Sequence, residues 1–113
     1  MSAITTHILD TALGKPAAGV EITLHQWEKN GTWKDLGTGV TNDDGRLNEA
    51  MQENILLQGT YRLTFAVAAY HERMGVKGFY PEVQIQFRIE DPTQHYHVPL
   101  LLNPFGYSTY RGS

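Results

Sequence analysis

Cysteine is absent from the 113 residues, and this absence removes several kinds of chemistry at once. The chain can form no disulfide bond, hold no metal through a thiolate and use no thiol nucleophile. The lack of cysteine leaves the cellular compartment open. Any reaction must therefore depend on histidine, carboxylate or hydroxyl groups, or on a metal, so the five histidines are the first residues to place.

Long hydrophobic runs and an excess of positive charge are also missing. The longest apolar run, residues 65–70, is far too short to cross a bilayer. Nine basic residues stand against twelve acidic ones, for a net charge of −3, and no lysine or arginine stripe is visible. We therefore expect neither a nucleic-acid partner nor a membrane. The first residues lack the basic and apolar regions of a signal peptide, so we expect a cytoplasmic protein.

Short alternating patterns of apolar and polar residues fill the rest of the chain, as expected for half-buried strands. With 113 residues and 41% hydrophobic residues, the chain is predicted to form one domain, 1–113, with a thin core. Seven to eight short strands with turn signals between them favour an all-β, two-sheet sandwich. The expected strands include residues 6–10, 20–25, 33–41, 61–65, 83–89, 94–102 and 107–110.

Turn and helix signals separate these strands. Asn30-Gly31 predicts a hairpin, and residues 42–45, Asn-Asp-Asp-Gly, predict a tight turn. Residues 66–74 have a composition that tolerates a helix and are followed by Gly75. We therefore expect one short helix in an otherwise all-β chain.

Two histidines lie two residues apart in His95-Tyr96-His97, so on a strand they point to the same face. The core face of this strand is expected to carry Tyr96, Val98 and the leucines that follow. A histidine pair on the other face can be an accident of the surface, part of a catalytic site, or two ligands of a zinc site that needs a third.

Three further features could contribute to a site. His7 is expected on the polar face of an opening strand, where a solvated histidine is the simpler interpretation. Arg46 follows the turn at 42–45 and either pairs with a neighbouring carboxylate or clamps a planar, oxygen-rich ligand. Residues 107–113 carry aromatic, arginine and hydroxyl side chains up to the last residue, which is unusual for a chain end.

Several blocks of sequence together resemble the transthyretin-related family and, within it, the 5-hydroxyisourate hydrolases. The matching blocks cover the chain from end to end and include the closing Tyr-Arg-Gly-Ser, the family's hallmark. They are His7-Ile8-Leu9-Asp10-Thr11-Ala12-Leu13-Gly14-Lys15-Pro16-Ala17, Asp43-Asp44-Gly45-Arg46, Tyr80-Pro81-Glu82-Val83, His95-Tyr96-His97-Val98-Pro99-Leu100-Leu101-Leu102 and Tyr110-Arg111-Gly112-Ser113.

The resemblance implies a two-sheet sandwich with one short helix, assembled as a homotetramer that is a dimer of dimers. It implies sites in a channel where dimers meet, built from His7, Arg46, His97 and the segment 110–113. The implied reaction opens the ring of 5-hydroxyisourate with water to give a ureido-imidazoline carboxylate, a step of urate degradation. No cofactor and no metal are implied.

Physical chemistry gives these residues hypothetical roles. Hydrolysis of a cyclic amide-like bond needs an activated water, a donor for the developing oxyanion and a proton for the leaving nitrogen. His7 and His97 are expected to position and deprotonate the water, with the choice of base left open, and Arg46 is expected to bind the substrate ring. In the tail, Tyr110, Arg111 and Gly112 are expected to bind substrate and Ser113 to assist catalysis. His95 is a possible supporting group behind His97.

Three other functions remain open from the residues alone. A transthyretin-like carrier would bind a small molecule without catalysis, although the chain keeps the histidine, arginine and tail positions. A metalloenzyme could use His7, His95 and His97 as ligands. A sandwich adhesion module would explain the fold but not the tail.

Overall fold

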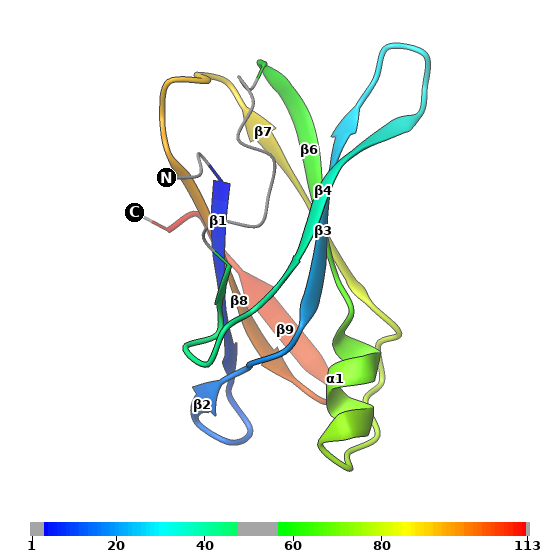
Figure 1. The fold of residues 1–113 in the computed structure, drawn as a ribbon, viewed down its shortest axis with the longest axis vertical. Helices are drawn as coiled ribbons and strands as arrows, with labels where there is room; N and C mark the ends of the chain where they lie inside the picture. The colour runs from blue at the N-terminus through cyan, green and yellow to red at the C-terminus, as the bar shows by residue number, and fades with distance from the viewer. Residues whose placement is uncertain (1–3, 48–56, 113) are drawn as a thin grey trace.

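Two β-sheets, in which most neighbouring strands are antiparallel, face each other in the computed structural model of the chain (Figure 1). The structure describes residues 4–47 and 57–112. The second sheet has the strand order β4-β3-β6-β7, and the first has the order β2-β1-β8-β9, with β5 also paired to β1. The strands of the first sheet are β1 (Ile4–Asp10), β2 (Lys15–Pro16), β5 (Arg46–Leu47), β8 (Tyr96–Asn103) and β9 (Gly106–Thr109). Those of the second are β3 (Glu21–Trp27), β4 (Trp33–Val40), β6 (Gly59–Phe65) and β7 (Val83–Ile89).

The predicted all-β sandwich with one short helix is confirmed, and the strand count is slightly higher than expected. The described residues form nine strands instead of seven to eight. The difference comes from β2 and β5, which have two residues each and are too short to show an alternating pattern. The hairpin at Asn30-Gly31 is present, because β3 and β4 pair up to Trp27 and Trp33 on either side of it.

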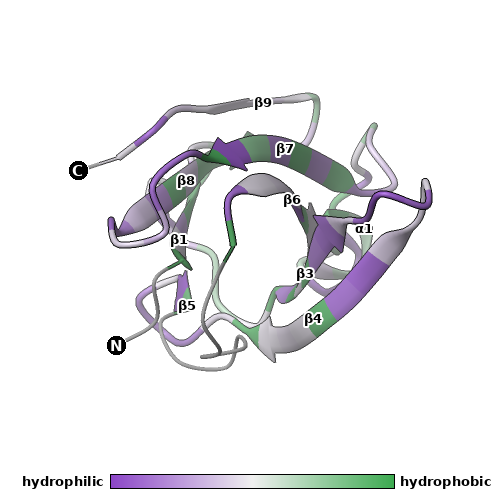
Figure 2. Cartoon of the chain, turned by 90° about the horizontal axis from the view of Figure 1, so that it is seen from above, coloured by the Kyte–Doolittle hydropathy of each residue, from purple (hydrophilic) through white to green (hydrophobic). Residues whose placement is uncertain are grey.

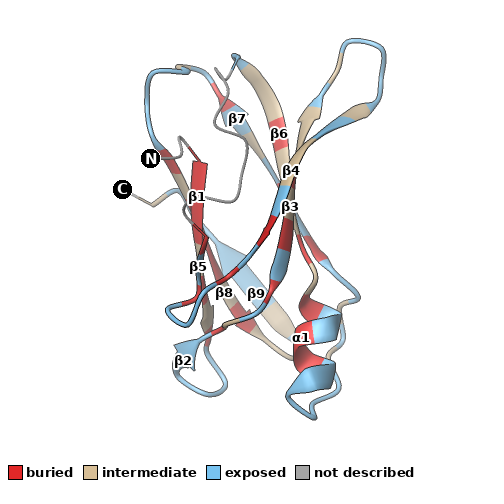
Figure 3. Ribbon diagram, in the orientation of Figure 1, coloured by how far each residue is buried: buried red, intermediate tan, exposed pale blue. Residues whose placement is uncertain are grey.

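The core lies between the sheets and follows from the alternation of each strand. Figure 2 shows bands of opposite hydropathy along β7, where apolar residues alternate with glutamine and arginine. Figure 3 shows β1 mostly buried and β9 mostly exposed. The fully buried side chains with the largest volumes are Tyr61, Phe65, Ile4, Ile8, Ile22, Leu24, Leu63, Ile89, Leu100, Leu102, Val20 and Val67.

The helix α1 (Val67–Arg73) follows β6 and ends just before Gly75, as the composition predicts. It packs through Val67, Tyr70 and His71. The Tyr70 hydroxyl donates a 2.7 Å hydrogen bond to Asp10 Oδ2 at the end of β1. Within residues 4–47 and 57–112, no helix is long and apolar enough to span a membrane.

The two ends of the sequence meet in the first sheet, where β1 pairs with β8 in parallel along its whole length. This pairing sets Thr5 beside His97 and His7 beside Pro99. It is the main long-range feature that brings the candidate residues together, because β5 and the C-terminal tail join the same sheet from opposite sides.

Candidate active site

The outer face of the first sheet carries a row of predicted site residues. His7 on β1 is in register with Arg46 on β5 and with Pro99 on β8. The pairing of Leu100 with Thr109 and of His97 with Gly112 sets Tyr110 opposite Pro99. Residues in register on neighbouring strands project from the same face. The row therefore brings Arg46, His7 and Tyr110 onto one face.

A tight turn positions Arg46 beside His7. Asn42 Oδ1 accepts 3.0 Å hydrogen bonds from the main-chain N–H groups of Asp44 and Arg46. Gly45 has a φ of +73°, and its carbonyl accepts a 2.8 Å bond from the Ile8 N–H. A Cβ at position 45 would lie 2.5 Å from the Ile8 carbonyl oxygen, so only glycine fits this approach to β1. The Asn-x-x-Gly turn thus fixes where Arg46 enters the sheet.

The next row of the same face holds the His97 ring. Thr5 Oγ1 lies 2.8 Å from His97 Nδ1 and 2.9 Å from His95 Nε2. His97 is half-buried, whereas Thr5 is only 6% exposed. We name the group formed by Thr5, His7, Arg46, His97 and Tyr110 the histidine face.

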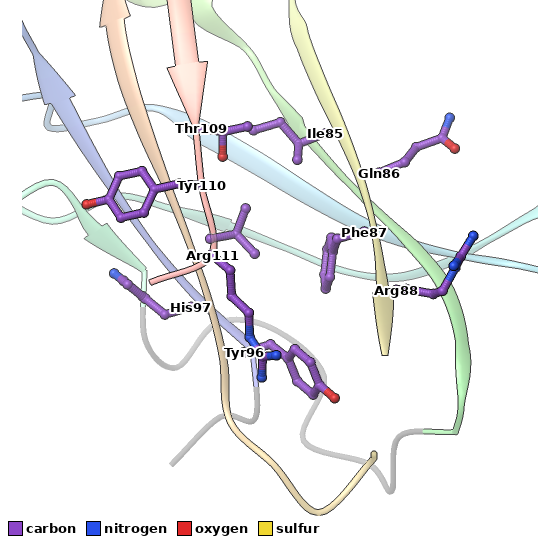
Figure 4. A pocket seen from close by; sticks show the side chains of 10 residues that line it. Ile85, Gln86, Phe87, Arg88, Tyr96, His97, Thr109, Tyr110 and Arg111 are labelled. Carbon is purple, nitrogen blue, oxygen red and sulfur yellow. The ribbon is translucent and has the colours of Figure 1, made fainter. Parts of the chain in front are cut away.

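The C-terminal tail covers one edge of the His97 ring. The Gly112 N–H donates a 2.8 Å hydrogen bond to the His97 carbonyl, which extends the antiparallel pairing of β8 and β9. Figure 4 shows the His97 and Tyr110 side chains projecting to the same side of the tail. The tail therefore adds Tyr110 to the histidine face and places main chain directly against His97.

The Arg111 side chain takes the opposite direction. Its guanidinium lies 4.6 Å from the centroid of the Tyr96 ring, and its Nη2 donates a 3.1 Å bond to Gln94 Oε1. The structure does not bring this side chain to His97, because alternation along the tail turns it away. Its predicted contact with substrate stays a prediction.

A pocket of about 320 Å³ lies between the tail and β7, and its lining includes His97, Tyr110 and Arg111 of the predicted site. Ile85 and Phe87 of β7 line it together with Tyr96 and Arg111 (Figure 4). The pocket therefore adjoins the histidine face at His97 and Tyr110.

Charge and burial favour the neutral form of His97. Its pKa is lowered from the ordinary 6.5, chiefly by burial, then by the positive charge of Arg46 and by His95 and His7. A contact with the Thr5 main chain acts in the other direction. A neutral imidazole near neutral pH can accept a proton, which is what a general base requires.

The structure thus brings together most of the residues predicted from the sequence. His7, Arg46, His97 and Tyr110 share one face, Gly112 contacts His97, and His95 is linked to His97 through the Thr5 hydroxyl. Ser113 lies outside the described residues. In residues 4–47 and 57–112, no group of three or more histidine and carboxylate side chains is arranged to hold a metal ion.

Thr5 was not predicted as a site residue. The only signal available was its position two residues before His7, which places both side chains on one face of a strand. Its partners lie 90 and 92 residues away, so the contact depends on a pairing that the sequence does not encode locally.

Topology and site together define a transthyretin-like β-sandwich with a basic, histidine-bearing outer face. The sequence matches the HIUase/Transthyretin family over residues 4–112. The chain belongs to this family.

Named relatives fall on both branches of the family. The 5-hydroxyisourate hydrolase of Halalkalibacterium halodurans is 48% identical over 115 aligned positions, covering 97% of each chain. The solved 5-hydroxyisourate hydrolase of Klebsiella pneumoniae is 39% identical, with a TM-score of 0.84 and 97% and 98% coverage of the two chains. Sea bream transthyretin, solved in complex with thyroxine, is 31% identical, with a TM-score of 0.91 and 97% and 94% coverage.

Backbone similarity and sequence identity therefore rank the two branches differently. The backbone superposes better on the sea bream transthyretin, whereas sequence identity is higher to the hydrolases. Function depends on particular side chains and not on the fold alone. Sequence identity and the residues of the histidine face are therefore better guides to function than backbone similarity.

Proposed function

We propose that this chain is a 5-hydroxyisourate hydrolase, which opens the ring of its substrate with water. One observation carries the proposal: His7, Arg46 and His97 lie on a single sheet face although they come from three strands distant in sequence. A carrier needs no general base beside a fixed cation. The 48% identity to a relative that bears the hydrolase name supports the same conclusion.

The chemistry assigned to the face is the addition of water to a ring carbonyl. A histidine removes a proton from the water as its oxygen bonds to the carbonyl carbon, and the ring C–N bond then breaks. The oxygen remains in the new carboxylate, and the leaving nitrogen takes up a proton. His97 fits the role of base because burial and Arg46 lower its pKa and so favour its neutral form. His7, in the neighbouring row, orients the water or returns the proton.

Arg46 and Tyr110 are assigned to substrate binding. A guanidinium presents a planar fork of donors that matches the oxygens of a urate-like ring and stabilises charge that develops on them. Tyr110 is 58% exposed and lies in the row of His7, so its ring can close over a flat substrate. Arg111, Gly112 and Ser113 are kept as further substrate-contacting candidates, with Ser113 also a candidate for catalysis.

The site is proposed to be completed by assembly into a homotetramer. Arg46 and Tyr110 are both exposed in the single chain. Among residues 4–47 and 57–112, the strands β7 and β9 lie at sheet edges, where another copy could pair with them. Two copies meeting through their histidine faces would enclose a channel between them.

The proposal is tested by following the ultraviolet absorbance of freshly generated 5-hydroxyisourate with and without the protein. We expect faster decay with the wild-type chain and the uncatalysed rate with a chain truncated after Thr109, which keeps all of β9. Unchanged decay with the wild type, together with measurable binding of thyroxine, would favour the carrier. Sedimentation of both chains reports separately whether the tetramer forms.

A further inference from the structure

The Thr5 hydroxyl lies between two imidazole rings. Its oxygen is 2.8 Å from His97 Nδ1 and 2.9 Å from His95 Nε2. Thr5 is nearly buried and lies opposite His97 in the parallel pairing of β1 and β8. Its hydroxyl therefore links the two histidines of the His-x-His motif.

A hydroxyl has one proton, so this link has a direction. Thr5 can donate to one ring nitrogen and must then accept from the other. If it donates to His95, then His97 carries its proton on Nδ1 and has a free lone pair on Nε2. If it donates to His97, then the proton of His97 is on Nε2 and that nitrogen cannot act as a base.

We propose that Thr5 is a positioning residue that fixes the tautomer of His97 and makes it depend on the protonation of His95. With His95 neutral, Thr5 donates to it, and His97 presents a lone pair at Nε2. With His95 protonated, its Nε2–H must donate to Thr5, and the Thr5 proton turns toward His97. The catalytic part of this inference rests on the proposed hydrolase function, and the structural part does not.

Positive charge around His97 opposes a second proton on its ring. Arg46 from β5, His7 from β1 and His95, which precedes β8, all lower the pKa of His97. Arg111, from the tail, is turned to Tyr96 and Gln94. The productive direction also suits a protonated His97, which donates through Nδ1 to Thr5 without any rearrangement.

Nitrogen chemical shifts of the imidazole rings test the tautomer without substrate. In the wild-type chain above neutral pH, His97 Nε2 should have the shift of an unprotonated nitrogen and Nδ1 that of an N–H. Thr5→Ser keeps the hydroxyl and should preserve this pattern, whereas Thr5→Val keeps the shape and should give a mixture of tautomers. A predominantly Nε2-protonated His97 in the wild type, or an unchanged pattern in Thr5→Val, would overturn the proposal.

A second measurement on the wild type alone keeps the test independent of how the variants fold. In molecules where His95 is protonated and His97 is still neutral, each state followed by the shifts of its own ring, His97 Nε2 should have N–H character. Independent titration of the two rings would contradict the link.

Turnover then tests the catalytic part. We expect kcat of Thr5→Val to fall roughly 10- to 100-fold with little change in KM, as for losses of other groups that orient a reacting residue, and Thr5→Ser to stay near wild type. A Thr5→Val chain with altered tautomers but wild-type kcat would refute the positioning role. A wild-type chain with the expected tautomer but no hydrolysis would refute the proposed function and leave the link in place.

Discussion

The main chain of Gly112 lies against the ring of His97. A Cβ built at position 112 would lie 2.6 Å from His97 Cδ2, well inside contact distance. The same residue donates its N–H to the His97 carbonyl at 2.8 Å. The tail therefore packs closely on the histidine that it covers. Position 112 requires glycine because any side chain would collide with the ring, and not because its backbone angles are unusual.

Gly112→Ala should inactivate the protein without unfolding it. The added methyl group must displace either the ring or the tail, and a shift of about 1 Å at a reacting group can cost about 100-fold in rate. The measurement is kcat/KM for ring opening, with urea unfolding to follow stability. Gly106→Ala is the matched control in the same segment, because the nearest atoms to its Cβ, those of the Asn103 amide, lie 3.8 Å away. Full activity in Gly112→Ala would show that the contact is unimportant.

Arg46→Met should raise the pKa of His97 toward 6.5. Arg46 contributes positive charge beside a half-buried imidazole, and removing that charge makes protonation easier. Nuclear magnetic resonance titration of His97 measures the change directly, and the acid limb of the activity profile should move to higher pH. Arg88→Met, on the exposed face of β7, is the control and should leave the titration where it is. A His97 titration unaffected by Arg46→Met would rule out the electrostatic role.

The depressed pKa of His97 also affects stability. A histidine with a lowered pKa in the folded state binds fewer protons than in the unfolded chain between that pKa and 6.5. The free energy of unfolding is therefore unaffected by this group above pH 6.5, and it decreases as the pH falls from 6.5 toward the pKa of His97 in the folded state. Arg46→Met should reduce this acid sensitivity.

Tyr70→Phe should destabilise the fold and leave catalysis intact. The Tyr70 hydroxyl is buried and donates to Asp10 Oδ2, while Asp10 Oδ1 accepts from the N–H groups of Ala12 and Leu13. Burial and the Asp10 carboxylate raise the pKa of Tyr70 to about 12, so it remains a donor at all moderate pH values. Losing one partner of a buried carboxylate should cost about 1–3 kcal/mol in urea unfolding. A parallel loss of kcat would show that this bond also supports the site.

Local patterns predicted the strands and turns because each depends on a few neighbouring residues. Residues 83–89 alternate cleanly and form β7, and the short helix ends before Gly75 as expected. The two-residue strands β2 and β5 escaped prediction because so short a segment shows no period. The parallel pairing of β1 with β8 also escaped, since nothing in either strand specifies its partner.

For the site, too, the sequence predicted the residue types and did not predict the contacts that depend on strand pairing. His7, Arg46 and His97 attract attention as residue types, and the family resemblance gathers them into one site before any geometry is known. Thr5 and the direction of the Arg111 side chain depend on register, which sequence alone leaves open. A threonine within a β-strand is too ordinary to be noticed without its partners.

The central claim is that His97 carries out ring opening on the histidine face, and His97→Asn tests it most directly. The measurement is the initial rate of absorbance decay of 5-hydroxyisourate, compared with wild type and with His25→Asn, a half-buried histidine of β3 in the other sheet. We predict a folded His97→Asn chain with a rate lower by about 10²–10⁴-fold, as expected for loss of a general base, and a His25→Asn chain close to wild type. A His97→Asn chain that opens the ring at the wild-type rate would contradict the account.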